Sequence, residues 1–291
     1  MTEPSMHKPC PQPESTHPRH GTTFDPAPYR EAIKLVQIHG ADHILREHTF
    51  RGDEWIADIG CGEGLVLRDR LLPLIPRGRV IGVDISAPML EAARNTITDP
   101  RVHFVRALGE ALPLGERSVD VVFSNFALHW MNTPERMAGA LRGAAEALKP
   151  GGVMLAYFSR AGTFAELFET AAAVGARPEW RHLFDGGAFR HPVLPPGDGI
   201  REEVRAAGLT LHSVEYVNRW LPLPSAADLT FWFRTCARPF MDRLHTPAAQ
   251  QLFAEQVVET YEALGARVPE ITRGGGLSIR DRAIALTARR E

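Results

Sequence analysis

The feature of this sequence that most limits its fold is a glycine-rich turn between an expected strand and an expected helix. The stretch 58–64 reads Asp-Ile-Gly-Cys-Gly-Glu-Gly, with a short apolar run at 55–59 leading into it and a helical pattern over 64–72 following it. Glycines at such a turn allow backbone conformations that other residues avoid, and they let a ligand approach the main chain closely. This order of elements is typical of an α/β domain that binds a cofactor at the turn.

Two acidic residues indicate which kind of cofactor the turn binds. Asp58 lies just before the glycines, where a carboxylate would repel a pyrophosphate and attract a cation, so an NAD-dependent oxidoreductase is disfavoured. Asp84 ends the next expected strand, and its two oxygens could accept hydrogen bonds from both ribose hydroxyls. Dinucleotide enzymes also place an acid there, so Asp84 alone does not separate the two classes. Together the acids favour a ligand with an α-amino group and no phosphate, of which S-adenosylmethionine is the common example.

The remaining elements predict a doubly wound, mainly parallel sheet of seven strands. After the first strand, helical patterns alternate with short apolar runs, and this alternation is typical of parallel strands joined by crossover helices. No simple crossover helix separates the last two runs, which predicts an antiparallel hairpin at one edge of the sheet. The seven strands are expected at 55–59, 79–84, 102–106, 119–124, 152–158, 209–223 and 277–289, and crossover helices at 88–96 and 134–148.

The length of 291 residues predicts one elaborated domain. A Pro- and His-rich tail at 1–23 is expected to be disordered, because its composition cannot bury enough apolar surface. Residues 24–160 are expected to form N-terminal helices and the cofactor-binding core, with a helix over about 29–48 in which Gly40 is the weak point. Residues 161–291 are expected to complete the sheet and to carry helical lid insertions at about 161–199 and 225–270.

Composition excludes several other classes of protein. Lys and Arg total 33 against 35 for Asp and Glu, so the broad basic surface of a nucleic-acid-binding protein is not expected. Three scattered cysteines without a CxxC pair, and twelve histidines without a ligand spacing, predict neither disulfides nor a metal site. Because no apolar run reaches the ~20 residues of a membrane span and the N-terminus has no secretory h-region, a cytoplasmic protein is expected.

Four motifs in order along the chain resemble those of the class I S-adenosylmethionine-dependent methyltransferases. They are Ala-Asp-Ile-Gly-Cys-Gly-Glu-Gly at 57–64, Gly-Val-Asp-Ile-Ser at 82–86, Glu-Ala-Leu-Pro at 110–113 and Leu-Lys-Pro-Gly-Gly at 148–152. The resemblance covers about residues 55–158 and implies that S-adenosylmethionine is bound and S-adenosylhomocysteine released.

In this resemblance the methionine moiety lies over the 58–64 loop, the ribose on Asp84, and the adenine near Ile85 and Met89. Many relatives carry an acid that bonds the adenine amine, and Leu108 stands at that position here, so adenine recognition would rest on the backbone of Leu108 and Gly109. The end of the fourth strand, with Asn125, would face the methyl group. The implied cofactor-binding residues are Asp58, Gly60, Cys61, Gly62, Gly64, Asp84, Ile85, Met89, Leu108, Gly109 and Asn125.

The Leu-His-Trp step at 128–130, the segment 177–180 and the two late insertions are similar to the juvenile hormone acid methyltransferases and, more loosely, to trans-aconitate methyltransferase. Both groups esterify a free carboxylate, and the resemblance implies that Gln37 and Trp130 hold that carboxylate here. A carboxylic acid with a pKa of about 4 is already ionised at neutral pH and needs no general base. His129 could donate a hydrogen bond, act as a base toward a hydroxyl, or be structural.

The expected lid is rich in aromatic residues, which collectively favour an apolar tail on the acceptor, although each alone is more often core than pocket. The sequence therefore predicts an enzyme that methylates the free carboxylate of a small, largely apolar acid. Three alternatives remain at this point: a hydroxyl, amine or carbon acceptor, a carrier-bound malonyl group, and a non-catalytic S-adenosylmethionine-binding assembly or regulatory protein.

Overall fold

The computed structural model describes residues 26–131, 133–184 and 199–291. Its centre is a seven-stranded sheet in the order β3-β2-β1-β4-β5-β7-β6, in which β7 runs in the direction opposite to the other six strands. This confirms the predicted fold class, including the antiparallel hairpin at the edge, while the tail at 1–23 lies outside the described residues. The strands are β1 (Trp55–Ile59), β2 (Arg79–Asp84), β3 (Val102–Arg106), β4 (Val119–Asn125), β5 (Leu148–Ser159), β6 (Thr210–Leu223) and β7 (Leu277–Arg289).

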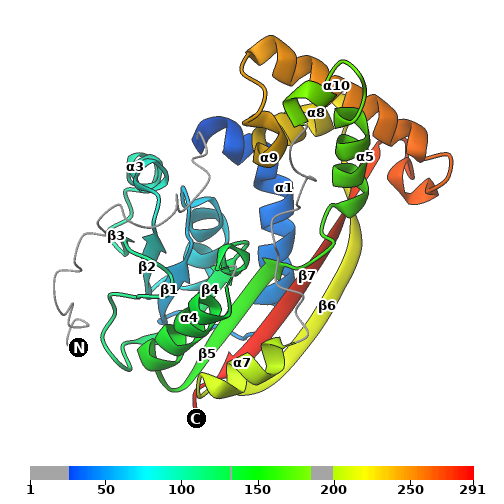
Figure 1. Cartoon of the computed structure of the whole chain (residues 1–291). Helices are drawn as coiled ribbons and strands as arrows, with labels where there is room; N and C mark the ends of the chain where they lie inside the picture. The colour runs from blue at the N-terminus through cyan, green and yellow to red at the C-terminus, as the bar shows by residue number, and fades with distance from the viewer. Residues whose placement is uncertain (1–25, 132, 185–198) are drawn as a thin grey trace.

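Helices cover both faces of the sheet (Figure 1). On one face α1 (Pro26–Leu45) and the π-helical turn η1 (Leu67–Leu71), which continues into α2 (Leu72–Leu74), pack through apolar residues. On the other face lie α4 (Pro134–Ala147) and α7 (Ile200–Ala206). The crossover helix α3 (Ala87–Thr96) begins at Ser86, whose hydroxyl accepts a hydrogen bond from the Met89 amide. The apolar core is thus divided into two layers by the sheet.

The strand order places a crevice beyond the carboxyl ends of β1 and β4. The chain runs outward from β1 through β2 to β3, and then returns to add β4 on the other side of β1. Connections therefore leave β1 and β4 toward opposite faces, which opens a space between them. The turn that carries Asp58 and the glycines and the loop that carries Asn125, His129 and Trp130 both begin at this point.

A helical lid extends beyond the end of β5 and the β6–β7 arm (Figure 1). Where two helical patterns were expected between 225 and 265, three helices form, because Pro239 begins a new short helix. The lid helices are α5 (Ala165–Gly175), α6 (Arg181–Phe184), α8 (Ala226–Cys236), α9 (Arg238–Met241) and α10 (Pro247–Leu264), followed by the 3-10 turn η3 (Pro269–Ile271); a further 3-10 turn, η2 (Leu128–Trp130), follows β4.

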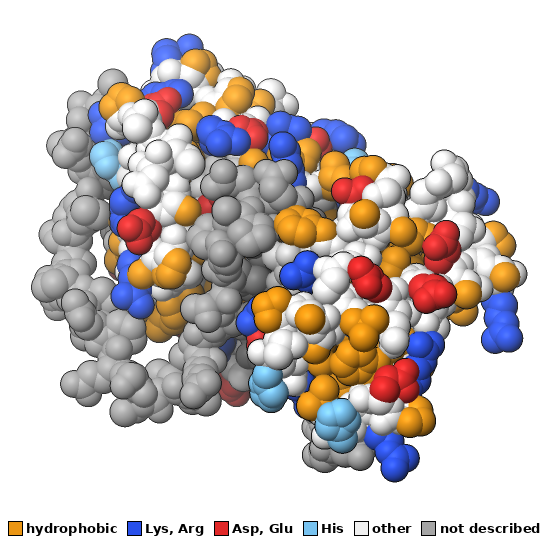
Figure 2. Space-filling model, turned by 90° about the horizontal axis from the view of Figure 1, so that it is seen from above, with side chains coloured by type: hydrophobic (Ala, Val, Ile, Leu, Met, Phe, Trp, Pro, Cys, Tyr) orange, Lys and Arg blue, Asp and Glu red, His pale blue; other side chains and the backbone are white. Residues whose placement is uncertain are grey.

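The lid aromatics pack mainly against one another. The Phe168 and Phe240 rings stack at 6.1 Å between centroids, and Phe233 and Phe253 lie 5.7 and 5.9 Å from Phe240. All four side chains are buried. On the lid end of the molecule, hydrophobic side chains form small groups among charged ones (Figure 2). These aromatics therefore form the core of the lid. Their number in the sequence is explained by this packing and is not evidence for an apolar tail on the acceptor.

Several element boundaries differ from the expected ones by one to four residues, and two of these differences lie close to the site. β5 begins four residues early, because the Lys-Pro-Gly-Gly stretch at 149–152 stays within the strand, with a register irregularity opposite Val119 and Val121 and Gly151 at φ +76°. The helix after the cofactor turn continues through η1 to Leu74, so it ends two residues later than expected. Neither difference moves a predicted site residue out of its element.

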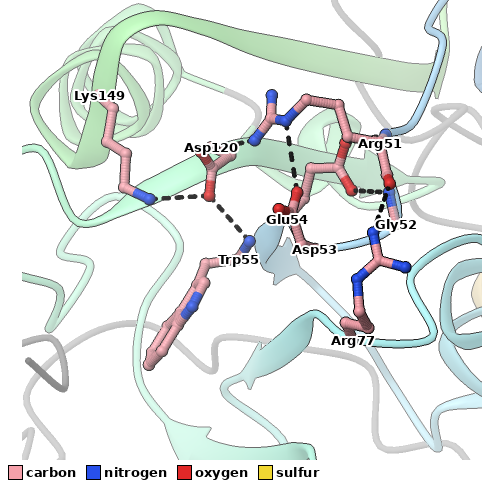
Figure 3. A network of polar contacts seen from close by, with 8 residues as sticks. All are labelled: Arg51, Gly52, Asp53, Glu54, Trp55, Arg77, Asp120 and Lys149. Carbon is pink, nitrogen blue, oxygen red and sulfur yellow. Dashed lines mark hydrogen bonds and ion pairs between the residues drawn. The ribbon is translucent and has the colours of Figure 1, made fainter. Parts of the chain in front are cut away.

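A network of hydrogen bonds and ion pairs connects three strands of the sheet at the end opposite the crevice (Figure 3). Asp120, at the start of β4, accepts hydrogen bonds from Lys149 Nζ at 2.8 Å, the Trp55 amide at 2.9 Å and Arg51 Nη2 at 3.2 Å. Nearby, the fully buried Glu54 carboxylate accepts hydrogen bonds from the Arg51 and Gly52 amides. Burial alone would raise the pKa of Asp120, but its hydrogen bonds outweigh that effect and lower the pKa. The network joins β1, β4 and β5.

We expect Asp120→Asn to destabilise the protein without changing cofactor affinity. Losing charge-assisted hydrogen bonds should lower the free energy of unfolding by about 1.5–3 kcal/mol at neutral pH. Because the pKa of Asp120 is lower in the folded state, its stabilising effect is present above the unfolded pKa of about 3.9 and is lost as the pH falls through the folded value. Urea unfolding across this pH range measures the difference, and equal stability at neutral pH would contradict the role assigned to the network.

Candidate active site

A narrow cleft lies between the turn after β1, the end of β4 and helix α1. Its volume is about 20 Å³, too small for the methionine moiety of a nucleoside cofactor, so we expect the cleft to widen when such a ligand enters, with α1 as the wall that moves outward. The cleft occupies the crevice expected from the strand order. It is lined by Gln37, Asp58, Gly60, Cys61, Gly62, Glu63, Leu65, Val66, Phe123 and Asn125.

The three glycines of the turn have different physical roles. Gly60, Gly62 and Gly64 all have positive φ, at +75°, +57° and +81°. A Cβ on Gly60 would overlap Cβ of Ala127, and one on Gly64 would lie 2.5 Å from Cδ1 of Ile97, so both positions are set by packing. A Cβ on Gly62 would meet nothing within 4 Å. Gly62 therefore faces open space, as the sequence predicts for a glycine that a ligand approaches.

Asp58 is a buried carboxyl beside a second carboxyl. Its side chain is 3% exposed, and burial together with the negative charge of Asp84 raises its pKa to about 8. A bound cation would favour the ionised form of Asp58 and reverse this shift. The α-ammonium group of S-adenosylmethionine fits this requirement.

Asp84 shapes the turn through both of its oxygens. Oδ2 accepts a hydrogen bond from the Gly62 amide at 2.8 Å, and Oδ1 accepts one from the Ser86 amide at 2.8 Å. Burial raises the pKa of Asp84 in spite of these hydrogen bonds. Each carboxylate oxygen can accept more than one hydrogen bond, so both remain able to receive a ribose hydroxyl. Asp84 thus fits the ribose role while holding Gly62 in place.

The loop expected to contact adenine is joined to the loop after β4. A Cβ on Gly109 would overlap Cε of Met131, so these two loops pack closely. Arg136 Nε donates to Glu110 Oε1 at 2.7 Å, and Arg136 Nη1 donates to the Trp130 carbonyl at 3.3 Å. Leu108 and Gly109 are half-buried in the loop after β3, Ile85 is half-buried just after β2, and Met89 is buried in the first turn of α3. The adenine contacts of these residues stay predictions.

The residues predicted to hold the acceptor are only partly brought together. Gln37 on α1 lines the cleft with Asp58 and Asn125, and Asn125 Nδ2 donates to the Gln37 carbonyl at 3.0 Å. Trp130 is 44% exposed and lies outside the cleft lining. His129 is buried, which lowers its pKa to about 3. A histidine with this pKa is a poor general base near neutrality, which favours its structural interpretation.

Sequence reasoning missed four cleft residues and one helix position. Glu63, Leu65, Val66 and Phe123 line the cleft, although they gave no signal beyond their place in the turn, a helix or a buried strand. Gly40 was interpreted as a weak point of the first helix, whereas a Cβ there would lie within 2.8 Å of Asn125, Phe126 and Tyr157. A glycine inside a helical pattern is a signal for such close packing. Among the described residues there is no cluster that could hold a metal ion, and no helix long and apolar enough to cross a membrane.

Comparisons with known proteins agree with this site. A family profile described as "Methyltransferase domain" matches residues 56–152. Juvenile hormone acid O-methyltransferase of Drosophila melanogaster is 32% identical over 234 residues, covering 74% of this chain and 76% of that protein. Trans-aconitate 2-methyltransferase of Paracidovorax citrulli is 29% identical over 78% of this chain and 84% of that protein.

The fold is likewise similar to that of solved structures. The YcgJ protein from Bacillus subtilis superposes with a TM-score of 0.56 at 20% identity, covering 87% of this chain and 99% of that one. The similarity to a relative over about three quarters of both chains, the glycine turn and the two buried carboxyls lead to the same conclusion. The chain belongs to the class I S-adenosylmethionine-dependent methyltransferases, uses S-adenosylmethionine as its methyl donor and releases S-adenosylhomocysteine.

Proposed function

We propose that this enzyme transfers the methyl group to the free carboxylate of a small, largely apolar acid. The observation that carries the proposal is the composition of the cleft wall. Gln37 and Asn125, which both carry carboxamides, line the cleft together with Asp58, and none of the described residues that line it is a Lys, Arg or His. With Asp58 assigned to the ammonium group of the cofactor, Glu63 is the other acid of this wall, and an acceptor that is already ionised needs neither of them as a base. Leu65, Val66 and Phe123 supply the apolar part of the wall.

The chain's own part in this reaction is to bind and orient. Bound S-adenosylmethionine supplies a methyl group, which forms a bond to a carboxylate oxygen while its bond to sulfur breaks and sulfur keeps the electron pair. No proton moves, so no side chain has to titrate. The Gln37 amide can donate a hydrogen bond to the second carboxylate oxygen without neutralising its charge, as Lys or Arg would. Alignment of this kind, with water excluded, is the main contribution a protein can make to such a displacement.

The acceptor class is also supported by the relatives. Juvenile hormone acid O-methyltransferase and trans-aconitate 2-methyltransferase are both named for acids, and both align with most of this chain. Trp130, which the family resemblance pairs with Gln37 on the carboxylate, is not part of the cleft lining and lies in the 3-10 turn that follows β4. We propose that it contacts the acceptor from that side.

The proposal is tested with labelled S-adenosylmethionine and a panel of acceptors. The panel should include apolar acids of graded length, aconitate, and matched alcohols and amines of the same carbon skeletons. We expect base-labile label, the signature of a methyl ester, on the acids alone. Base-stable label on an alcohol or an amine would refute the carboxylate proposal while leaving the methyltransferase assignment in place.

Gln37→Glu is expected to distinguish an anionic acceptor from an amine more sharply than Gln37→Ala, which only removes the carboxamide. A carboxylate at this position would repel an anionic acceptor across a buried cleft, so kcat/KM should fall by about 100-fold or more. Gln37→Ala should cost about tenfold, because only a hydrogen-bond donor is lost. Steady-state kinetics with the labelled acceptor measure both. If the acceptor were an amine, Gln37→Glu would retain or gain activity, and the order of the two variants would be reversed.

A further inference from the structure

A fully buried polar pair lies behind helix α1, away from the cleft lining. The Tyr157 hydroxyl on β5 donates to Asp281 Oδ2 on β7 at 2.6 Å, and Arg219 Nε on β6 donates to the same oxygen at 3.3 Å. Tyr157 and Asp281 are both 0% exposed. A carboxylate buried to this extent is costly even when paired, and replacing such a pair by apolar residues is often neutral or stabilising. The pair therefore calls for an explanation other than stability.

Tyr157 shapes the loop that follows β4. It is the register partner of Asn125, and its carbonyl accepts a hydrogen bond from the Phe126 amide at 2.7 Å. Phe126 has φ +53°, a left-handed conformation that is costly for a residue with a side chain. Its ring lies 5.3 Å from the Tyr157 ring and 6.4 Å, edge-on, from the His129 ring. The Tyr157 side chain is thus a surface against which this strained turn is held.

Tyr157 also lies directly under α1. A Cβ on Gly40 would be 2.8 Å from Cδ1 of Tyr157, so the helix backbone rests on the Tyr157 ring. The His43 ring, one turn further along α1, lies 5.7 Å from the same ring. Asn125, beside Tyr157, donates to the Gln37 carbonyl. The placement of Gln37 over the cleft therefore depends on the same ring that supports Phe126.

We propose that Tyr157 and Asp281 are positioning residues for methyl transfer, which fix α1 and the 125–130 loop relative to each other and to the cofactor turn. The hydrogen bond to Asp281 fixes the tilt of the Tyr157 ring, and the ring fixes the two elements that contact it. Neither residue lines the cleft, so the pair acts through Gln37 and Asn125 and does not touch the acceptor. The inference concerns the site of the proposed function but does not depend on the acceptor being a carboxylate.

Tyr157→Phe removes the hydroxyl and keeps the ring, and hydrogen exchange of the full-length protein tests the result without any acceptor. We expect faster exchange at residues 37–41 and 125–131, with the cofactor turn at 58–64 unchanged. Asp281→Asn keeps an oxygen that can accept a hydrogen bond from the Tyr157 hydroxyl. This variant should therefore show the wild-type exchange pattern in these segments. With whichever acceptor is labelled, kcat should fall about tenfold in Tyr157→Phe. The affinity for S-adenosylmethionine should stay within about twofold of wild type.

Tyr261→Phe is the matched control. Tyr261 on α10 is also 0% exposed, and its hydroxyl donates to the Ser278 carbonyl at 2.8 Å, so the same group is lost in the lid. This variant should show a similar loss of stability but no selective change at 37–41 or 125–131, and an unchanged kcat. If both variants gave the same exchange pattern, or if Tyr157→Phe kept full kcat, the pair would be structural only and the proposal would be overturned. A wild-type enzyme that labels no acid would count against the proposed function, but it would leave the inference about Tyr157 and Asp281 unaffected.

Discussion

Gly62→Ala is expected to leave the protein folded and to weaken S-adenosylmethionine binding by more than about tenfold, whereas Gly60→Ala should lower the stability of the protein much more strongly. The new methyl on Gly62 would project into open space, so stability should fall only by the roughly 1–2 kcal/mol that a left-handed alanine costs. We propose that the cofactor approaches the main chain through that open space, so the methyl would take up room the ligand needs. Calorimetric titration with S-adenosylmethionine measures the affinity, and urea unfolding measures the stability.

Gly60→Ala is the matched comparison within the same turn. Its Cβ would overlap Cβ of Ala127, so overpacking adds to the conformational cost and the total should reach roughly 3 kcal/mol or more. The two variants therefore separate a ligand-facing glycine from a packing glycine. If Gly62→Ala bound the cofactor as tightly as the wild type, the assignment of the ligand to this side of the turn would be wrong.

Asp58→Asn is expected to abolish measurable cofactor binding while making the free protein more stable above neutral pH. The folded pKa of Asp58, about 8, lies above the unfolded value of about 3.9, so the unfolded state binds fewer protons between these values. The contribution of Asp58 to the free energy of unfolding is therefore full below about pH 4 and is lost as the pH rises through about 8. Asparagine has no proton to lose, so this variant should exceed the wild type by roughly 1–3 kcal/mol near pH 8.

The same shift predicts that cofactor binding releases a proton from the wild-type protein. An ammonium group beside Asp58 favours the carboxylate, so binding below about pH 8 should expel the proton that the free protein holds. Titrations in buffers with different ionisation enthalpies measure this release directly. A wild-type enzyme that binds S-adenosylmethionine without releasing a proton at neutral pH would show that Asp58 is not the partner of the ammonium group.

Much of the sheet could be predicted from sequence because its strands are short, apolar and separated by turn residues. The third strand begins and ends at the predicted residues, Val102 and Arg106, and Asp99 and Arg101 pair just before it. The early start of β5 could not be predicted, since Pro150 and Gly151 are typical of a turn. The strand extends past them because Leu148 on one side and Val153 on the other pair with β4, and the Gly151 amide donates a hydrogen bond to the Arg290 carbonyl. The number of lid helices was predicted less well, because Pro239 divides one expected helical pattern into two helices.

The cofactor side of the site was accessible to sequence reasoning because its chemistry is local. Asp58 and the glycines lie within seven residues, and Asp84 follows at the end of the next strand. The support behind the acceptor side was not accessible, because Tyr157 and Asp281 are 124 positions apart and meet only once β7 is inserted next to β5. The exposure of Trp130 was equally hidden, since the short 3-10 turn that carries it follows the left-handed Phe126.

A crystal structure with S-adenosylhomocysteine and an acid acceptor tests the central claim most directly, that methyl transfer takes place in the cleft between the 58–64 turn and α1. The account predicts the ammonium group against Asp58, the ribose hydroxyls on Asp84, α1 displaced outward, and the acceptor carboxylate bonded to Gln37 on the sulfur side of the ligand. A sulfur atom that faced away from Gln37, or an acceptor bound outside this cleft, would contradict it.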